Sequence, residues 1–307
     1  MHTVGNDAAE RTVLVLGGGG MRGMAHVGVH QALEEHGIRI DEVVATSVGA
    51  TVGALICGGL ENAEIASLVA DLSKRDQFRI NLLRLLVRGH RAGAVYRGGP
   101  FRASLRRALP VHDFRALAIP LVCNATSLEA GEPRYFGDGE DLDVPLPDAC
   151  YASCALPGVF APLRIDDDHY VDGGVTDAVP LGTAHRRNPG ARILTVDLTP
   201  YTVRRKGAFD TSIRQILLRS YILTARALAD RNREAYESAN VCLVRPPLGG
   251  LGKFDYSRIA EVIERGYETT CAALEGSALF PEVGGPVVET DERPGEDEQA
   301  SHLSDIA

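Results

Sequence analysis

Ser47 stands among small residues, in the stretch ATSVGA at 45–50, directly after a short apolar run. Ala45 precedes it by two positions and Gly49 follows it by two. This is the spacing of a nucleophile elbow, in which a sharp strand-to-helix turn exposes the hydroxyl and leaves room only for small neighbours. The usual pattern is G-x-S-x-G, and Ala45 departs from it by one methyl group, which a residue with negative φ tolerates. Taken alone, the motif would favour a serine that only caps a helix.

Asp172, in the stretch YVDGGVTDAVP at 170–180, is the candidate for the base that such a serine needs. A serine hydroxyl is a weak nucleophile until a neighbouring base takes its proton. Gly173 and Gly174 follow the carboxylate and let it approach another loop closely. Because an isolated D-G-G more often marks a plain turn, the assignment depends on the presence of Ser47.

Four glycines at 17–20 join a strand-like run at 12–16 to a helical run, and with Gly23 they contain the spacing G-x-G-x-x-G. A loop of this kind offers backbone N–H groups to an anion. A dinucleotide site needs an acidic residue at the carboxyl end of the second strand. Asp41 and Glu42 precede that strand instead, and no Gly-Lys-Ser/Thr follows the glycines as a Walker loop requires. The remaining chemical use is an oxyanion hole, against the plainer alternative of a tight turn.

The elements that must position these residues alternate along the chain. Short apolar runs predict strands at 12–16, 42–46, 119–127, 192–198 and 240–246, with 134–137 as a hairpin mate of the third. Longer periodic runs predict helices at 21–37, 48–59, 211–238 and 256–274. A small-residue segment at 152–165, broken at Pro157, leads into the strand that ends at Asp172. Strands separated by helices predict an α/β fold with a mostly parallel sheet covered on both faces.

Four blocks occur in a fixed order, and together they resemble the bacterial branch of the patatin-like phospholipases. They are 16–29 (LGGGGMRGMAHVGV), 45–50 (ATSVGA), 152–162 (ASCALPGVFAP) and 171–181 (VDGGVTDAVPL). The resemblance covers residues 13–198 motif by motif. It implies a three-layer α/β/α fold and a lipid acyl hydrolase of the phospholipase A, lysophospholipase or esterase type. It also implies a Ser-Asp dyad, an acyl-enzyme intermediate and no cofactor.

The same resemblance assigns roles to residues of this chain. The nucleophile would be Ser47 and the base Asp172. The oxyanion loop would comprise Gly18, Gly19, Gly20 and Arg22, and the supporting small residues would be Gly23, Ala45, Gly49, Gly173 and Gly174. Two alternatives from other classes stay open. One is a nucleotide-binding protein that uses the glycine loop, and the other is an inactive scaffold of the same fold, against which the presence of both Ser47 and Asp172 argues.

Two further groups invite a functional interpretation. His185 follows Asp172, and Ser-Asp-His is the chain order of ordinary α/β-hydrolase triads, so a Ser-Asp-His esterase is a third alternative. His185 lies at a predicted helix end, where a histidine simply complements the helix dipole, and we expect no catalytic role for it. The run DDDH at 166–169 lacks the alternate spacing and closing Glu of a calcium loop, so we expect a solvated hairpin turn there.

Composition narrows the class of protein. The 307 residues carry a formal charge of −9, of which the stretch 282–305 contributes −7. The nearly neutral remainder gives no argument for nucleic-acid binding. Six cysteines are scattered in apolar segments, so we expect reduced core residues and no metal site, with Cys150 and Cys154 packing on one helical face. Neither a signal peptide nor an apolar run long enough to span a membrane is visible, and a cytoplasmic location is the expectation.

Three segments have their own predicted character. Residues 1–10 should be a flexible N-terminus, 11–281 the hydrolase domain and 282–307 an acidic, disordered tail. The region 74–115 has eleven Lys or Arg against two Asp, and within it 78–91 intersperses arginines with apolar residues. Such a segment favours peripheral contact with an anionic membrane. The alternative is an ordinary amphipathic helix packed on the body of the protein.

Overall fold

The computed structural model describes residues 11–72, 94–96, 98–199, 212–236, 240–249 and 258–280. The predicted flexible N-terminus at 1–10, the basic amphipathic segment at 78–91 and the acidic tail at 282–307 lie outside the described residues.

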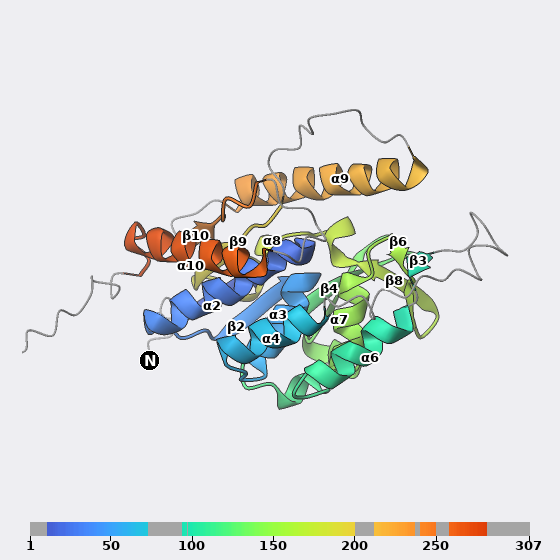
Figure 1. Ribbon diagram of the computed structural model, residues 1–307, viewed down its shortest axis with the longest axis horizontal. Helices are drawn as coiled ribbons and strands as arrows, with labels where there is room; N and C mark the ends of the chain where they lie inside the picture. The colour runs from blue at the N-terminus through green and yellow to red at the C-terminus, as the bar shows by residue number, and fades with distance from the viewer. Residues whose placement is uncertain are drawn as a thin grey trace, which may run out of the picture.

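An eight-stranded sheet forms the centre of the described structure (Figure 1). Its strands are β1 (Thr12–Leu16), β2 (Glu42–Thr46), β4 (Leu121–Ser127), β5 (Pro133–Phe136), β7 (Leu163–Ile165), β8 (Asp168–Asp172), β9 (Arg192–Val196) and β10 (Val241–Val244). They follow the order β10-β9-β1-β2-β4-β8-β7, with β5 paired to β4. The five strands from β10 to β4 are parallel, whereas β5, β7 and β8 pair antiparallel. The predicted mostly parallel sheet is confirmed.

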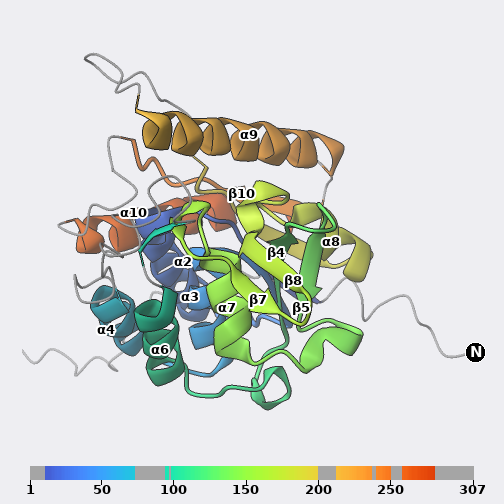
Figure 2. The same cartoon turned by 90° about the vertical axis from the view of Figure 1, so that its right-hand side faces the viewer.

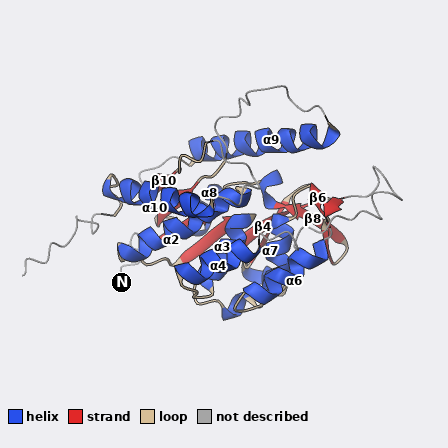
Figure 3. Ribbon diagram, in the orientation of Figure 1, coloured by secondary structure: helices blue, strands red, loops and turns tan. Residues whose placement is uncertain are grey.

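Helices and a second small sheet surround this centre (Figure 3). The α-helices are α2 (Ala25–Glu35), α3 (Val48–Cys57), α4 (Asn62–Leu72), α6 (Gly98–Ala108), α7 (Leu146–Cys154), α8 (Leu181–Arg187), α9 (Ile213–Ala235) and α10 (Ile259–Glu275). Short 3-10 turns are η1 (Gly20–Met24), η4 (Phe114–Ala116), η5 (Gly139–Leu142) and η6 (Gly173–Val175). The second sheet pairs β3 (Ala94–Tyr96) in parallel with β6 (Gly158–Phe160).

The central sheet buries both of its faces. Successive strand residues point to opposite faces. Leu14 and Leu16 of β1 join a core that includes side chains of α2, α3, α7 and α10. Val13 and Val15 join a separate core with side chains of α8 and α9. The fold is therefore the predicted three-layer α/β/α arrangement, and burial on both faces explains why such strands appear as unbroken apolar runs in the sequence.

Helices α2 and α10 pack in direct backbone contact. A Cβ atom at Gly28 would lie 1.9 Å from the carbonyl oxygen of Ile263, and one at Gly266 would lie 2.2 Å from that of Ala25. Only glycine permits this approach at both positions. Because α10 also contacts η1, the close packing holds in place the turn that follows the glycine loop.

Candidate active site

The ends of β2 and β8 meet head-on along one edge of β4. Thr46, the last residue of β2, pairs with Asn124, and Asp172, the last residue of β8, pairs with Ala125. Strand β5 occupies the opposite edge of β4 at these positions. Because β2 runs parallel and β8 antiparallel to β4, the two strands point at each other. The residue that follows β2, Ser47, is thereby placed beside the carboxylate that ends β8.

Ser47 has a conformation that few residues other than glycine adopt. Its φ is 57° and its ψ is −128°, at the N-terminus of α3. Its hydroxyl makes no capping bond to the helix and instead donates to Asp172 Oδ2 at 2.7 Å. Its backbone N–H donates to Ser153 Oγ of α7, also at 2.7 Å. Strained backbone of this kind persists only where its surroundings hold it, and it is concentrated at functional sites.

Asp172 is buried, with 2% of its surface exposed, and both carboxylate oxygens are engaged. Oδ2 accepts the Ser47 hydroxyl, while Oδ1 accepts the N–H of Gly174 at 2.8 Å and the hydroxyl of Tyr221 at 3.2 Å. Burial and the charge of Asp172 raise the pKa of Tyr221 well above its ordinary value, so the phenol keeps its proton and acts as donor. Helix α9 therefore contributes to the site through Tyr221.

Small residues surround Ser47 because larger ones would collide. A Cβ atom at Gly49 would lie 2.3 Å from the carbonyl oxygen of Leu16, and one at Gly23 would lie 2.3 Å from a methyl group of Val48. Ala45 lies within β2, where its extended backbone tolerates the extra methyl group, as expected from the sequence.

The two glycines after Asp172 permit an equally close approach. A Cβ atom at Gly173 would lie 2.4 Å from the carbonyl oxygen of Asn124, and one at Gly174 would lie 2.4 Å from the Tyr221 hydroxyl. Asn124 also donates to the Gly173 carbonyl oxygen at 3.3 Å. The hydroxyl of Thr46, in turn, donates to Asn124 Oδ1 at 2.7 Å. These bonds tie together the ends of the two strands that meet at the site.

The glycine loop passes directly against the serine. A Cβ atom at Gly18 would lie 3.2 Å from the Ser47 Cβ. Beneath the loop, the buried His26 of α2 places Nε2 2.8 Å from the Gly17 carbonyl oxygen. Burial lowers the pKa of His26 to about 4, so its ring is neutral and donates to this carbonyl. His26 thus fixes the start of the loop.

The predicted oxyanion loop is only partly available to an anion. The Gly18 N–H donates to the Ala178 carbonyl oxygen at 2.9 Å, which removes it from the predicted set of donors. Within the described residues, the amides of Gly19 and Gly20 have no backbone acceptor of this kind. Arg22 follows in η1, and burial lowers the pKa of its guanidinium. The amides of Gly19 and Gly20 are therefore the members of the predicted set that stay candidates for donors to an oxyanion.

Several residues singled out in the sequence have other surroundings. The His185 ring lies against Tyr236, with ring centroids 5.4 Å apart. Asp166 and Asp167 form the turn between β7 and β8, as expected. All six cysteines are free thiols; Cys57, Cys123, Cys150 and Cys242 are buried, and Cys154 and Cys271 are partly so. In the part of the chain that the structure describes, no three His, Cys, Asp or Glu side chains are grouped to hold a metal ion. Among those same residues, no helix combines the length and apolar character needed to cross a bilayer.

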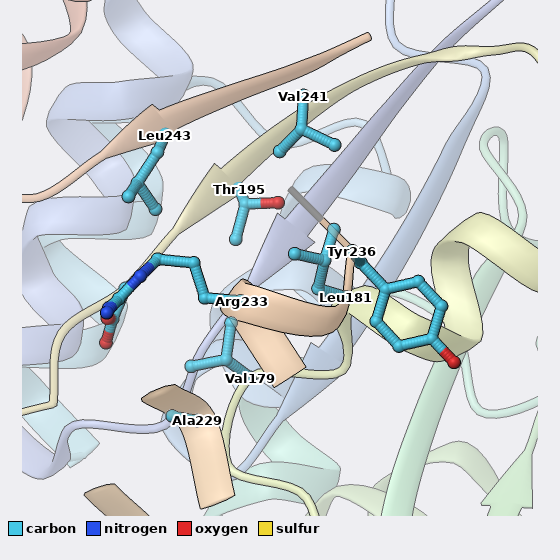
Figure 4. A pocket seen from close by; sticks show the side chains of 9 residues that line it. Val179, Leu181, Thr195, Ala229, Arg233, Tyr236, Val241 and Leu243 are labelled. Carbon is cyan, nitrogen blue, oxygen red and sulfur yellow. The ribbon is translucent and has the colours of Figure 1, made fainter. Parts of the chain in front are cut away.

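A cavity of about 100 Å³ lies between the sheet and α9 (Figure 4). Its lining is mostly apolar and comprises Val179, Leu181, Thr195, Asp197, Ala229, Arg233, Tyr236, Val241 and Leu243. Neither Ser47 nor Asp172 contributes to it. The cavity is therefore separate from the site.

Sequence reasoning missed three residues that contact the site or its loop. Ser153 was part of a quoted small-residue block but received no role, and His26 lay in the block that contains the glycine loop. Tyr221 lies in a helix whose periodicity gave no sign of a contact with Asp172. A polar residue on the inward face of a predicted helix is the signal that could have identified His26 and Tyr221.

Comparison with known proteins relates this site to a family. The profile of the patatin-like phospholipase family matches residues 14–185, which include the glycine loop, Ser47 and Asp172. An NTE family protein of Mycobacterium tuberculosis is 35% identical over 178 residues, covering 58% of this chain and 46% of that protein. A patatin-like phospholipase domain-containing protein of Caenorhabditis elegans is 30% identical over 276 residues, covering 82% of this chain and 20% of that protein. A lysophospholipase of Candida albicans is 25% identical over 304 residues, covering 91% of this chain and 21% of that protein.

The chain spans about half the length of its mycobacterial relative and about a fifth of the other two. Among solved structures, VipD from Legionella pneumophila has a TM-score of 0.48 and 15% identity, with 87% of this chain and 67% of that chain covered. The family profile covers more than half of the chain, and the resemblance noted in the sequence is confirmed. This chain belongs to the patatin-like phospholipase family.

Proposed function

We propose that the chain is a serine hydrolase of lipid acyl esters, with Ser47 as the nucleophile and Asp172 as the base. The observation that carries the proposal is the 2.7 Å hydrogen bond from Ser47 Oγ to Asp172 Oδ2, made by a serine with a φ of 57°. A serine that only caps a helix gains nothing from this conformation, whereas a nucleophile must project its hydroxyl out of a sharp turn. Membership of the patatin-like phospholipase family supports the same chemistry.

In the proposed reaction, Asp172 Oδ2 accepts the hydroxyl proton as Ser47 Oγ attacks the carbonyl carbon of an ester. The carbonyl electron pair moves onto oxygen and forms a tetrahedral oxyanion. Collapse of this intermediate breaks the bond to the leaving alcohol, which takes the proton from Asp172. Water, deprotonated by the same carboxylate, then attacks the acyl-enzyme; collapse releases the acid and returns a proton to Ser47. Asp172 is thus the single proton carrier of both halves, and these steps use no cofactor.

The amides of Gly19 and Gly20 are the proposed donors to the oxyanion. Both follow Gly18, which passes directly against Ser47 and whose own amide is already bonded. Backbone amides on a fixed loop need no reorganisation as charge develops, and the loss of one such donor in comparable sites costs about 2.7–4 kcal/mol. We assign Arg22 to bracing this loop, because it lies in the turn that directly follows.

Lipid esters with a single acyl chain are the first substrates to test, because the Candida albicans relative is a lysophospholipase. The proposed class also includes diacyl phospholipids and simple carboxylic esters. A panel of lysophospholipid, diacyl phospholipid and a soluble short-chain ester, assayed with the wild-type protein and Ser47→Ala, separates these substrates. The Ser47→Ala protein should hydrolyse none of them.

Labelling with a fluorophosphonate tests the nucleophile directly. The reagent should modify Ser47 and no other serine, because only an activated hydroxyl reacts rapidly. Labelling that persists in Ser47→Ala would contradict the assignment. Ser153→Ala is a matched control, because Ser153 contacts the Ser47 backbone without sharing its hydroxyl bond, and its replacement should leave a labelled site in the protein.

Asp172→Asn and His185→Ala distinguish a dyad from a triad. The asparagine side chain is nearly isosteric with aspartate but has no usable basicity, so ester hydrolysis should be lost in a folded protein. His185→Ala should keep activity within about tenfold of wild type, or about 1.4 kcal/mol. Collapse of activity in a folded His185→Ala protein would restore the Ser-Asp-His alternative. Tight nucleotide binding in a melting assay would instead favour the nucleotide-binding alternative.

A further inference from the structure

The outer side of α9 exposes large apolar side chains. Ile216 is 45% exposed, Leu217 62% and Leu223 47%. Across the described residues, the only other large apolar side chain with such exposure is Leu128, at 54%, in the turn after β4. Figures 1 and 2 show α9 lying along one side of the molecule, with no other described helix or strand beyond it. Exposed apolar residues are normal when scattered, but a cluster on one helix indicates an interaction surface.

These side chains form part of a continuous uncharged stripe. In helical spacing, the exposed residues Ser220, Thr224 and Ala227 fall between and beside Ile216 and Leu223. From 213 to 229 the helix has three charged residues, Arg214, Arg219 and Arg226, and no acidic one. The first acid is Asp230, whose carboxylate lies 3.5 Å from Arg226 Nε. An uncharged stripe accompanied only by basic charges over about five turns matches an anionic lipid surface better than a neutral or basic one.

The side of the same helix opposite Ile216 and Leu223 faces the dyad, and Leu217, four residues before Tyr221, lies closer to that side. Ala225 and Ala229 are buried against the body of the protein, and Tyr221 donates to Asp172. A helix with its side chains is about 10–12 Å across. A lipid surface in contact with the outer side of α9 would therefore lie about one helix diameter from Asp172. For an enzyme whose substrates reside in a bilayer, this brings the substrate reservoir next to the site.

We propose that the outer side of α9, formed by Ile216 and Leu223 with Leu217 at its edge and Arg226 alongside, docks the protein on anionic lipid bilayers. The inference rests on the proposed lipid hydrolase function, but it concerns a surface that shares no residue with the dyad. The apolar side chains enter the boundary between headgroups and acyl chains, while Arg226, whose side chain is 30% exposed, remains at headgroup level. This surface is distinct from the basic segment at 78–91.

Vesicle sedimentation tests the proposal. The wild-type protein should bind vesicles of phosphatidylcholine mixed with phosphatidylglycerol, and bind pure phosphatidylcholine more weakly. The double variant Leu217→Ser and Leu223→Ser should bind the mixed vesicles at least about tenfold more weakly, because two apolar side chains no longer enter the bilayer. Leu128→Ser is the matched control, since it removes a leucine of intermediate exposure, 54% against 62% and 47%, from a different surface, and its binding should equal that of wild type.

Two further measurements separate this proposal from the proposed function. Hydrolysis of a soluble short-chain ester should be unchanged in the double variant, and its melting temperature should stay close to that of wild type. A protein that binds vesicles through α9 but hydrolyses no ester would refute the function and keep the docking surface. Equal vesicle binding by wild type and double variant, or an equal loss in Leu128→Ser, would overturn the docking proposal. A wild-type dimer in gel filtration that the double variant abolishes would also overturn it, in favour of a second copy.

Discussion

Acidification should destabilise this protein through His26. The ring is buried beneath the glycine loop, and burial lowers its pKa from 6.5 to about 4. In the unfolded chain the imidazole takes up a proton near its ordinary pKa of about 6.5, whereas the folded protein resists it down to about pH 4. The unfolded state therefore binds more protons in this window, and the free energy of unfolding falls as the pH falls. Above about pH 6.5 the contribution is fully retained.

The size of this effect follows from the shift in pKa. A difference of about 2.5 pKa units corresponds to about 3 kcal/mol, lost progressively between about pH 6.5 and pH 4. Urea unfolding at a series of pH values measures it, with His26→Gln as the comparison. The glutamine amide can still donate to the Gly17 carbonyl oxygen but does not titrate.

Comparison of the two proteins isolates the histidine, because every other titrating group is common to both. The wild-type protein should lose up to about 3 kcal/mol more than His26→Gln as the pH falls from 7 to 4. Parallel pH profiles for the two proteins would refute the reasoning. Such a result would mean that the imidazole is protonated in the folded state without cost.

Three other outcomes are expected. Tyr221→Phe removes a donor from the ionised Asp172, so the acidic limb of the pH profile of kcat/KM should move to higher pH, whereas a purely structural role would leave its midpoint unchanged. Burial raises the pKa of Asp177 to about 6. Between about pH 4 and 6 the folded protein keeps a proton that the unfolded chain releases, so the free energy of unfolding should fall by about 3 kcal/mol as the pH rises through this range. In urea unfolding of Asp177→Asn, this fall in the free energy of unfolding should be absent. The same pH dependence in the variant and the wild-type protein would contradict the prediction. Gly28→Ala should lower the free energy of unfolding by about 1–3 kcal/mol, because the added methyl group meets the α10 backbone. Gly99→Ala should not lower it, because a methyl group there meets no atom within 4 Å. Thermal unfolding measures both, and equal melting temperatures for the two variants would argue against close packing of α2 on α10.

The sheet could be predicted because its strands are apolar on both faces. The runs at 12–16 and 42–46 coincide with β1 and β2, and the later apolar runs contain β4, β9 and β10. The helix predicted at 21–37 begins as α2 only at Ala25, because the residues after the glycines form the 3-10 turn η1. Glycine-rich sequence weakens helix formation at that end.

The contacts around the site were only partly predictable. Ser47 and Asp172 are marked by the small residues that their close packing requires, and these are visible in the sequence. Tyr221 reaches Asp172 across 49 positions of chain, and the Ser153 hydroxyl reaches the Ser47 amide across 106. Such long-range contacts depend on how the layers pack, which local spacing does not encode. The hydrogen bond from the Gly18 amide was unpredictable for the same reason, because its acceptor, the Ala178 carbonyl oxygen, lies far along the chain.

The antiparallel strand β8 explains how an aspartate can contact the serine without an intervening histidine. In a purely parallel sheet, the ends of neighbouring strands lie side by side, about 4.8 Å apart, and none faces the end of another. Here β8 runs against β2 along the same edge of β4, so the end of one strand faces the end of the other. The carboxylate then meets the hydroxyl directly, at 2.7 Å. A shift of β8 by one residue would turn Asp172 to the other face of the sheet, so the contact between Asp172 and Ser47 depends on the β4–β8 register.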